Sequence, residues 1–283
     1  MLENTAIVLQ GYSVSKEQME EVVRSYIDQG IKNIVVSSYS KCISDFVRKN
    51  AAVIEHDKVN GKFKNTPVDQ FKIKTPDIQG GFTEGFKIRG RGNGQHVTVN
   101  ADVKIPSSVE TKLGNVNYQI YTSKEGLLLA KKEFGAEYAL KCRADILIYN
   151  LVEKLTNWIK MVNTNPPRDN VFDSRILAPA YSGSGWAVVD YLAFGKTDDL
   201  VNYYSIPFYT PKQDPKRKFH IAEQYISSSR ILSIAKEEFK TSFDTLGKKY
   251  FCFDPDIDAY WYKPKAYLKD MPIFKKVLSL VQK

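Results

Sequence analysis

The sequence lacks any apolar run approaching the roughly 18 residues that a membrane-spanning helix needs. Its first residues also lack the basic and small-residue segments of a signal peptide. Cysteine is scarce: Cys42, Cys142 and Cys252 are isolated and form no CxxC pair, which argues against zinc sites and against a disulfide framework. These absences predict a cytoplasmic protein in a reduced compartment.

Positive charge, in contrast, is in excess. The 283 residues carry a formal net charge of +9, and 43% of them are hydrophobic. A chain of this size and composition can build one sizeable core, so we expect residues 1–283 to form a single domain. A basic surface favours anionic partners such as nucleic acid, phosphorylated small molecules or an anionic membrane. The basic residues are spread along the chain without an RNP, KH or helix-turn-helix pattern, so we expect no specific nucleic acid partner.

The last residues, 261–283, hold six lysines against one aspartate, with apolar residues interleaved among them. We therefore expect a basic C-terminal helix or tail. Its composition fits a helix lying on anionic lipid, which would place the protein peripherally at the inner membrane. It also fits an ordinary terminal helix docked on the core.

The periodicity of the apolar residues predicts an α/β fold. Residues 5–10 read as a buried strand. A helix should follow, capped by Ser15 and ended by Gly30, and then a second short strand. This order implies a right-handed parallel unit. The same alternation of strand and helix patterns returns after residue 115, so we expect a mainly parallel central sheet flanked by helices.

Residues 56–114 do not continue the alternation of strands and helices, and we expect them to form a β-rich insertion outside the main sheet. Residues 71–74, 86–90 and 97–105 alternate as strands do. The glycines between the last two segments do not fit a phosphate-binding loop, because a strand and not a helix follows them. His56 and His96 are expected at the surface of this insertion.

The stretch of most interest reads EYALKCRADILIYN. It is an apolar strand pattern in which Arg143 and Asp145 stand two positions apart. Buried parallel strands are usually almost continuously apolar, and ligands bind beyond their carboxyl ends. We therefore expect Asp145, late in the strand, to face a ligand. The alternatives are a salt bridge with Arg143 or a cap for the next helix.

Four segments resemble the WavE-type lipopolysaccharide-synthesis family of bacterial glycosyltransferases. They read NTAIVLQG, YQIYTSKEGLLLAKKEFGAEYALKCRADILIYN, VVDYLAFGKTDDLVNYYSIP and IAEQYI, and they lie within residues 4–40 and 115–230. The resemblance implies a GT-A-like fold and transfer of a sugar from a nucleotide-sugar, with a UDP-sugar expected first. It also implies a glycan or glycolipid acceptor of a lipopolysaccharide or capsule pathway.

In GT-A-like folds a strand-end aspartate, usually the last of a D-x-D, holds a divalent metal on the donor pyrophosphate. The resemblance therefore implies that Asp145 is the ligand of a Mn²⁺ or Mg²⁺ ion. Here the stretch reads Arg143-Ala144-Asp145, so one carboxylate is present instead of two. Arg143 either carries part of the charge that the metal would supply or pairs with Asp145 structurally.

Other nucleotide-sugar-binding residues are expected at strand and helix ends. By the resemblance, Gln10 and Gly11 hold the nucleotide in the loop after the first strand, and Ser37 contacts it from the second. Gln119 and Lys124 are expected to open the helix before the key strand, where the positive helix end attracts phosphate. Structural turns and an ordinary helix start are the alternatives.

Asp190 and Glu223 are the candidates for the base that takes the proton of the acceptor hydroxyl. Asp190 is expected inside the apolar strand VVDYLAF, where burial should raise its proton affinity, whereas a helix start should lower that of Glu223. Position at the mouth of a cleft nevertheless favours Glu223. The alternatives are a buried ion pair for Asp190 and a first-turn glutamate that stabilises its helix.

A different class of function remains open at this point. The protein could be a non-catalytic α/β module that binds glycan or nucleic acid, because the first aspartate of a D-x-D is missing and the net charge is +9. Hydrolysis of a donor without acceptor would separate an enzyme from a glycan-binding relative. A salt-sensitive affinity for DNA would favour nucleic acid.

Overall fold

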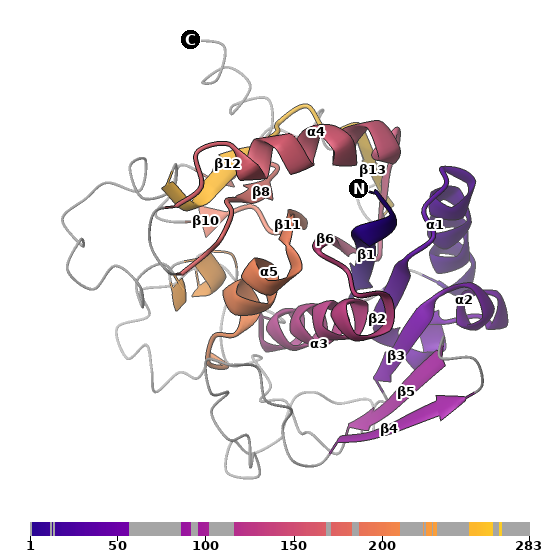
Figure 1. The fold of residues 1–283 in the computed structure, drawn as a ribbon. Helices are drawn as coiled ribbons and strands as arrows, with labels where there is room; N and C mark the ends of the chain where they lie inside the picture. The colour runs from indigo at the N-terminus through magenta and orange to yellow at the C-terminus, as the bar shows by residue number, and fades with distance from the viewer. Residues whose placement is uncertain are drawn as a thin grey trace.

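The computed structural model describes residues 2–11, 13, 15–56, 86–91, 96–101, 116–167, 171–182, 187–209, 223, 225–227, 229–230, 249–262 and 266–267. Within these ranges the chain is an α/β protein built on one nine-stranded sheet (Figure 1). The strand order is β12-β8-β11-β6-β1-β2-β3-β5-β4. The strands span Thr5–Gln10 (β1), Ile34–Tyr39 (β2), Ala52–His56 (β3), Phe86–Arg91 (β4), His96–Ala101 (β5), Tyr138–Arg143 (β6), Ile176–Ala178 (β8), Leu192–Lys196 (β11) and Phe251–Phe253 (β12).

The centre of the sheet is parallel, as the sequence predicts. Strands β6, β1, β2, β3 and β5 run in one direction, and β8 and β12 run the same way. Strand β11, between β6 and β8, and the edge strand β4 run in the opposite direction. Strand β1 is fully buried on both faces, which explains its continuous apolar run. This architecture is shared by many α/β proteins and does not identify a GT-A fold, so the GT-A assignment stays a prediction.

Helices cover both faces of the sheet (Figure 1). Side chains of α1, α2 and α4 pack into one core, and those of α3 and α5 pack into a second core on the opposite face. The helices span Lys16–Asp28 (α1), Asp45–Asn50 (α2), Val116–Phe134 (α3), Leu151–Asn163 (α4) and Thr197–Tyr204 (α5). The expected limits of α1 are confirmed: Ser15 caps it by accepting from the Gln18 amide, and Gly30 follows its end with φ +86°.

Helix α3 lies very close to the sheet at Gly126. A Cβ atom built there would meet Val8 Cγ1 at 2.5 Å and Ser37 Cβ at 3.2 Å. A residue without a side chain therefore lets α3 seat directly on β1 and β2. This contact fixes the helix against the two strands whose carboxyl ends carry predicted site residues.

The segment 137–150 is not one strand. Strand β6 ends at Arg143, and β7 (Ile146–Ile148) leaves the main sheet to pair with β13 (Ala259–Trp261), which also pairs with β14 (Ala266–Tyr267). In the predicted basic C-terminal helix or tail, Trp261 and Ala266–Tyr267 are therefore strand, and residues 263–265 lie outside the described part of the chain. Residues 268–283 lie outside the described part of the chain.

The predicted insertion is β-rich where it is described, but it is not separate from the main sheet. Strands β4 and β5 form an antiparallel hairpin, and β5 pairs with β3 at the sheet edge. An edge strand offers unpaired backbone groups that another strand can satisfy, which explains this extension. Residues 57–85 and 102–115, including the predicted strand at 71–74, lie outside the described residues.

Cys42, Cys142 and Cys252 are buried free thiols. In the described residues no helix is long and apolar enough to cross a lipid bilayer.

Candidate functional site

The predicted site residues gather at the carboxyl edge of β1, β2 and β6. Gln10 is the last residue of β1, and its register partners are Ser37 on β2 and Arg143 on β6. Strand β11 runs antiparallel to β6, so its beginning meets the end of β6, with Leu192 opposite Cys142. Asp190, two residues before β11, is thereby carried to the same edge.

Gln10, Gly11 and Ser37 are tied to the protein itself. Gln10 is buried and its Oε1 accepts from Thr122 of α3 at 2.8 Å, and the Gly11 amide donates to the Ser37 carbonyl at 3.0 Å. Gly11 has φ +87°, a conformation that favours glycine. These contacts support a structural role in shaping the loop after β1.

His56 is buried, which corrects its assignment to the surface. It ends β3, and its Nε2 lies 2.9 Å from Ser37 Oγ, while its ring packs edge-on against Tyr121. Burial lowers the pKa of His56 to about 4. The ring is therefore neutral at pH 7 and holds Ser37 in place.

Arg143 and Asp145 form a two-point ion pair just after the end of β6. Arg143 Nε and Nη2 donate to the two carboxylate oxygens at 2.9 and 2.8 Å. The Asp145 side chain is 3% exposed, whereas that of Arg143 is 31% exposed. Burial opposes the charge of Arg143, but the bonds to Asp145 outweigh it and raise its pKa. The guanidinium, and not the carboxylate, therefore faces solvent.

The residues at this edge do not fit a metal held by the protein alone. Both Asp145 oxygens already accept from Arg143. The described residues contain no group of three or more His, Cys, Asp and Glu side chains that could hold a metal ion. An ion at Asp145 would need most of its ligands from the phosphates of a donor, so the Mn²⁺ or Mg²⁺ assignment stays a prediction.

Asp190 is a buried carboxyl group with an unsatisfied oxygen. The residue is 5% exposed, and its Oδ2 atom has no hydrogen-bond partner among the described residues. Burial raises the pKa of Asp190, while the charges of Lys141 and Arg143 oppose that rise. The direction agrees with the sequence prediction. Asp190 lies just before β11, however, and not inside the strand.

Glu223 interacts electrostatically with Asp190, Lys141 and Arg143, and it is more exposed than Asp190. It lies in a helical turn, where its carbonyl accepts from Ser227, whose Oγ accepts in turn from the Val188 amide, two residues before Asp190. Burial, and next the charge of Asp190, raise the pKa of Glu223 to about 7. The expectation of a lowered pKa is wrong, because desolvation and the neighbouring Asp190 carboxylate raise it.

The assignment of Lys124 to a helix start is also wrong. Helix α3 begins at Val116, so Gln119 lies in its first turn and Lys124 lies about two turns after Val116. Lys124 is half-buried, and burial lowers its pKa. Ile120, Tyr121 and Thr122 are strand-favouring residues that hid the start of this helix.

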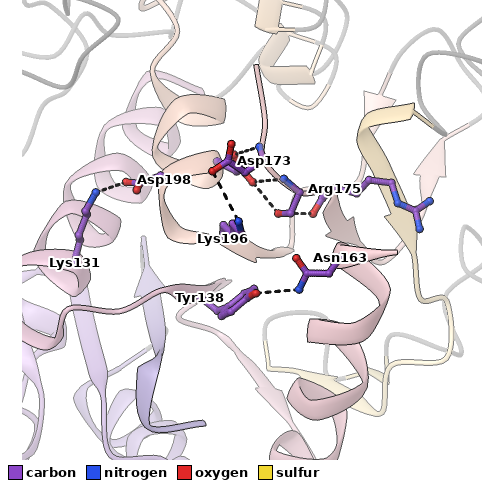
Figure 2. Close-up of polar contacts among 9 residues, drawn as sticks. Lys131, Tyr138, Asn163, Asp173, Arg175, Lys196 and Asp198 are labelled. Atoms are coloured by element: carbon purple, nitrogen blue, oxygen red, sulfur yellow. Dashed lines mark hydrogen bonds and ion pairs between the residues drawn. The ribbon is translucent and has the colours of Figure 1, made fainter. Parts of the chain in front are cut away.

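The opposite edge of the sheet carries several ion pairs and hydrogen bonds within the protein (Figure 2). Lys131 pairs with Asp198 at 2.5 Å, and Lys196 lies 3.8 Å from Asp173. Asp199 accepts from the Ser174 amide and hydroxyl at 2.8 and 2.7 Å. These contacts hold β8, β11 and α5 together.

Sequence reasoning missed Lys141 and three tyrosines around Asp190 and Glu223, which we call the carboxyl pair. Lys141 is fully buried in β6, and its Nζ donates to the Asp190 carbonyl at 2.6 Å. Tyr191, Tyr203 and Tyr204 have raised pKa values, first by burial and then in part by nearby charges that include Asp190. A lysine between Leu140 and Cys142 in an apolar strand was the signal that could have found this site.

No family model matches this sequence, and no curated protein matches it either. The resemblance to the WavE-type family therefore stays a prediction. Arg143, Asp145, Asp190 and Glu223 share one edge of the sheet independently of that resemblance.

The raised pKa of Glu223 predicts a pH-dependent stability. Between its ordinary value near 4.5 and about 7 the folded state holds a proton that the unfolded state has lost. The free energy of unfolding should therefore fall as the pH rises through this window. We expect about 1–2 kcal/mol from this group, since each pKa unit is worth about 1.4 kcal/mol and partial solvation reduces it.

Urea denaturation at pH 4.5 to 8 would measure this slope in the parent and in Glu223→Gln. The variant should lose that part of the slope, while Glu153→Gln, at an exposed position of α4, should keep it. Parent and Glu223→Gln curves with the same slope would contradict the buried, proton-holding state of Glu223.

Proposed function

We propose that this protein is a glycosyltransferase that moves a sugar from a nucleotide-sugar, a UDP-sugar first, to a bacterial surface glycan or glycolipid. One observation carries the proposal. Arg143, Asp190 and Glu223 share the carboxyl edge of a mostly parallel sheet, where α/β proteins bind ligands. This group combines an accessible cation with carboxyl groups whose pKa values are raised.

The accessible cation suits the leaving group. When the sugar departs, negative charge grows on the nucleoside diphosphate, and a fixed positive group lowers the energy of that state. Arg143 offers a guanidinium that is partly exposed and held in orientation by Asp145. Because the protein groups do not fit a metal by themselves, we assign this charge to Arg143.

The carboxyl pair suits the acceptor. A hydroxyl group is a weak nucleophile until a base takes its proton, and a base works best when its pKa lies near the working pH. Glu223, with a pKa of about 7 and a half-buried side chain, meets both requirements. Asp190 is more deeply buried and is suited to orient the acceptor hydroxyl through its unsatisfied oxygen.

A thermal-shift screen of UDP-, GDP-, CDP- and dTDP-sugars, each with and without Mn²⁺, tests the proposal. A donor at 100 times its dissociation constant should stabilise the protein by about 2.7 kcal/mol. Arg143→Met should lose this shift. Arg24→Met should keep it, because Arg24 pairs with Glu20 on the outer face of α1.

Each outcome of the screen has a distinct meaning. A shift that requires Mn²⁺ would assign the phosphate charge to a metal. Binding without transfer or donor hydrolysis would favour a non-catalytic glycan-binding protein. No shift with any donor, together with salt-sensitive binding of DNA, would overturn the proposal in favour of a nucleic-acid-binding module.

A further inference from the structure

Lys141 is a fully buried lysine in the central strand β6. Its register partners on the neighbouring strands are Val8 and Ala193, both buried in the core beneath α3 and α5. A buried amine is costly unless it has a partner. An apolar side chain would satisfy the packing at this position, so the lysine requires another reason.

The contacts of Lys141 point to the segment that carries the carboxyl pair. Its Nζ donates to the Asp190 carbonyl at 2.6 Å, and the Tyr204 ring centroid lies 5.4 Å from it. The Arg143 amide donates to the carbonyl of Tyr191 at 3.0 Å. Strand β6 therefore holds residues 190 and 191 at two successive points, one of them through a cationic side chain.

We infer that Lys141 is a positioning residue of the site: it anchors the segment of Asp190 and compensates the negative charge of that residue, so that Glu223 is the carboxyl group that exchanges a proton. The inference rests on the proposed function only for the use of that proton in sugar transfer. The arrangement of charges can be tested without any substrate.

The charges around Asp190 and Glu223 determine how these two carboxyl groups titrate. Burial lowers the pKa of Lys141, and the charge of Asp190 opposes that change. For Glu223, the charge of Asp190 raises the pKa more than either Lys141 or Arg143 alone lowers it. The groups around the pair are Lys141 and Arg143 on β6, Asp145 after it, Tyr191 before β11, and Tyr203 and Tyr204 on α5.

Removing the ammonium should move the proton of the pair from Glu223 to Asp190. Carbon-13 NMR of the glutamate side-chain carboxyl carbons would follow Glu223, with its signal assigned from Glu223→Gln. In Lys141→Gln the titration midpoint of Glu223 should fall by about one pH unit, because a neutral Asp190 no longer raises it. Lys131→Gln, at an ion pair on the opposite edge, should leave the midpoint unchanged.

Two further measurements keep the inference testable. Lys141→Gln placed on Asp190→Asn should no longer lower the Glu223 midpoint and should instead raise it, because only the direct effect of the ammonium, which lowers the pKa of Glu223, is then removed. In the parent protein the nitrogen-15 signal of Lys141 should report a charged ammonium at pH 7. A neutral amine there, or an unchanged Glu223 midpoint in folded Lys141→Gln, would overturn the inference. Absence of transfer by the parent protein would instead refute the proposed function alone.

Discussion

Replacing Glu223 by glutamine is expected to lower the rate of sugar transfer by about 10²–10⁴-fold, the usual contribution of a general base. The amide keeps the size of the side chain but cannot take a proton. Donor binding should stay close to that of the parent, because Glu223 is assigned to the acceptor. Transfer and donor affinity, measured in parallel, would separate these two effects.

Asp190→Asn and Glu153→Gln complete this comparison. Asp190→Asn should lower transfer less than Glu223→Gln, since Asp190 is assigned to orientation, and Glu153→Gln on the exposed side of α4 should leave it unchanged. If Glu223→Gln transfers sugar near the parent rate while Asp190→Asn binds donor and is inactive, the two roles are reversed.

Replacing Asp145 by asparagine should weaken donor binding or turnover by ten-fold or more, which corresponds to about 1.4 kcal/mol or above. The carboxylate holds the guanidinium of Arg143 at two points, and an amide cannot accept at both. We also expect a loss of about 1–3 kcal/mol in the free energy of unfolding, because a buried charge-assisted interaction is broken. Calorimetric titration with the donor and denaturant unfolding would measure the two effects.

Asp198→Asn is the control for this variant, since it breaks an exposed ion pair at the opposite edge. It should change donor affinity little. Unchanged donor affinity and turnover in folded Asp145→Asn would remove Asp145 from the site. Tighter donor binding would show that Asp145 competes with phosphate for Arg143.

Local sequence patterns predicted the elements that local interactions determine. The fully apolar run of β1 and the cap at Ser15 needed no knowledge of distant residues. The segment 137–150 could not be predicted without knowledge of distant residues, because its second half pairs with residues 259–261, more than a hundred positions away. No local pattern could show that the chain changes sheets between Arg143 and Ile146.

The site was predicted in part for the same reason. Arg143 and Asp145 stood out as charges in an apolar strand, and the structure joins them directly. Asp190 reaches them because β11 runs antiparallel to β6, a direction that the sequence does not reveal. Lys141 was missed because it fits the alternation of a strand, and only the position of Asp190 shows what its ammonium contacts.

The turn that carries Asp145 joins two sheets, and the carbonyl of Asp145 accepts from the amide of Tyr262 at 3.0 Å. During synthesis the amino-terminal strands leave the ribosome first, so β1, β2 and β6 can pair long before residues 259–262 exist. The surroundings of Asp145 are complete only after this late segment has been added. A nascent chain can therefore build most of its central sheet while the proposed donor site is still unfinished.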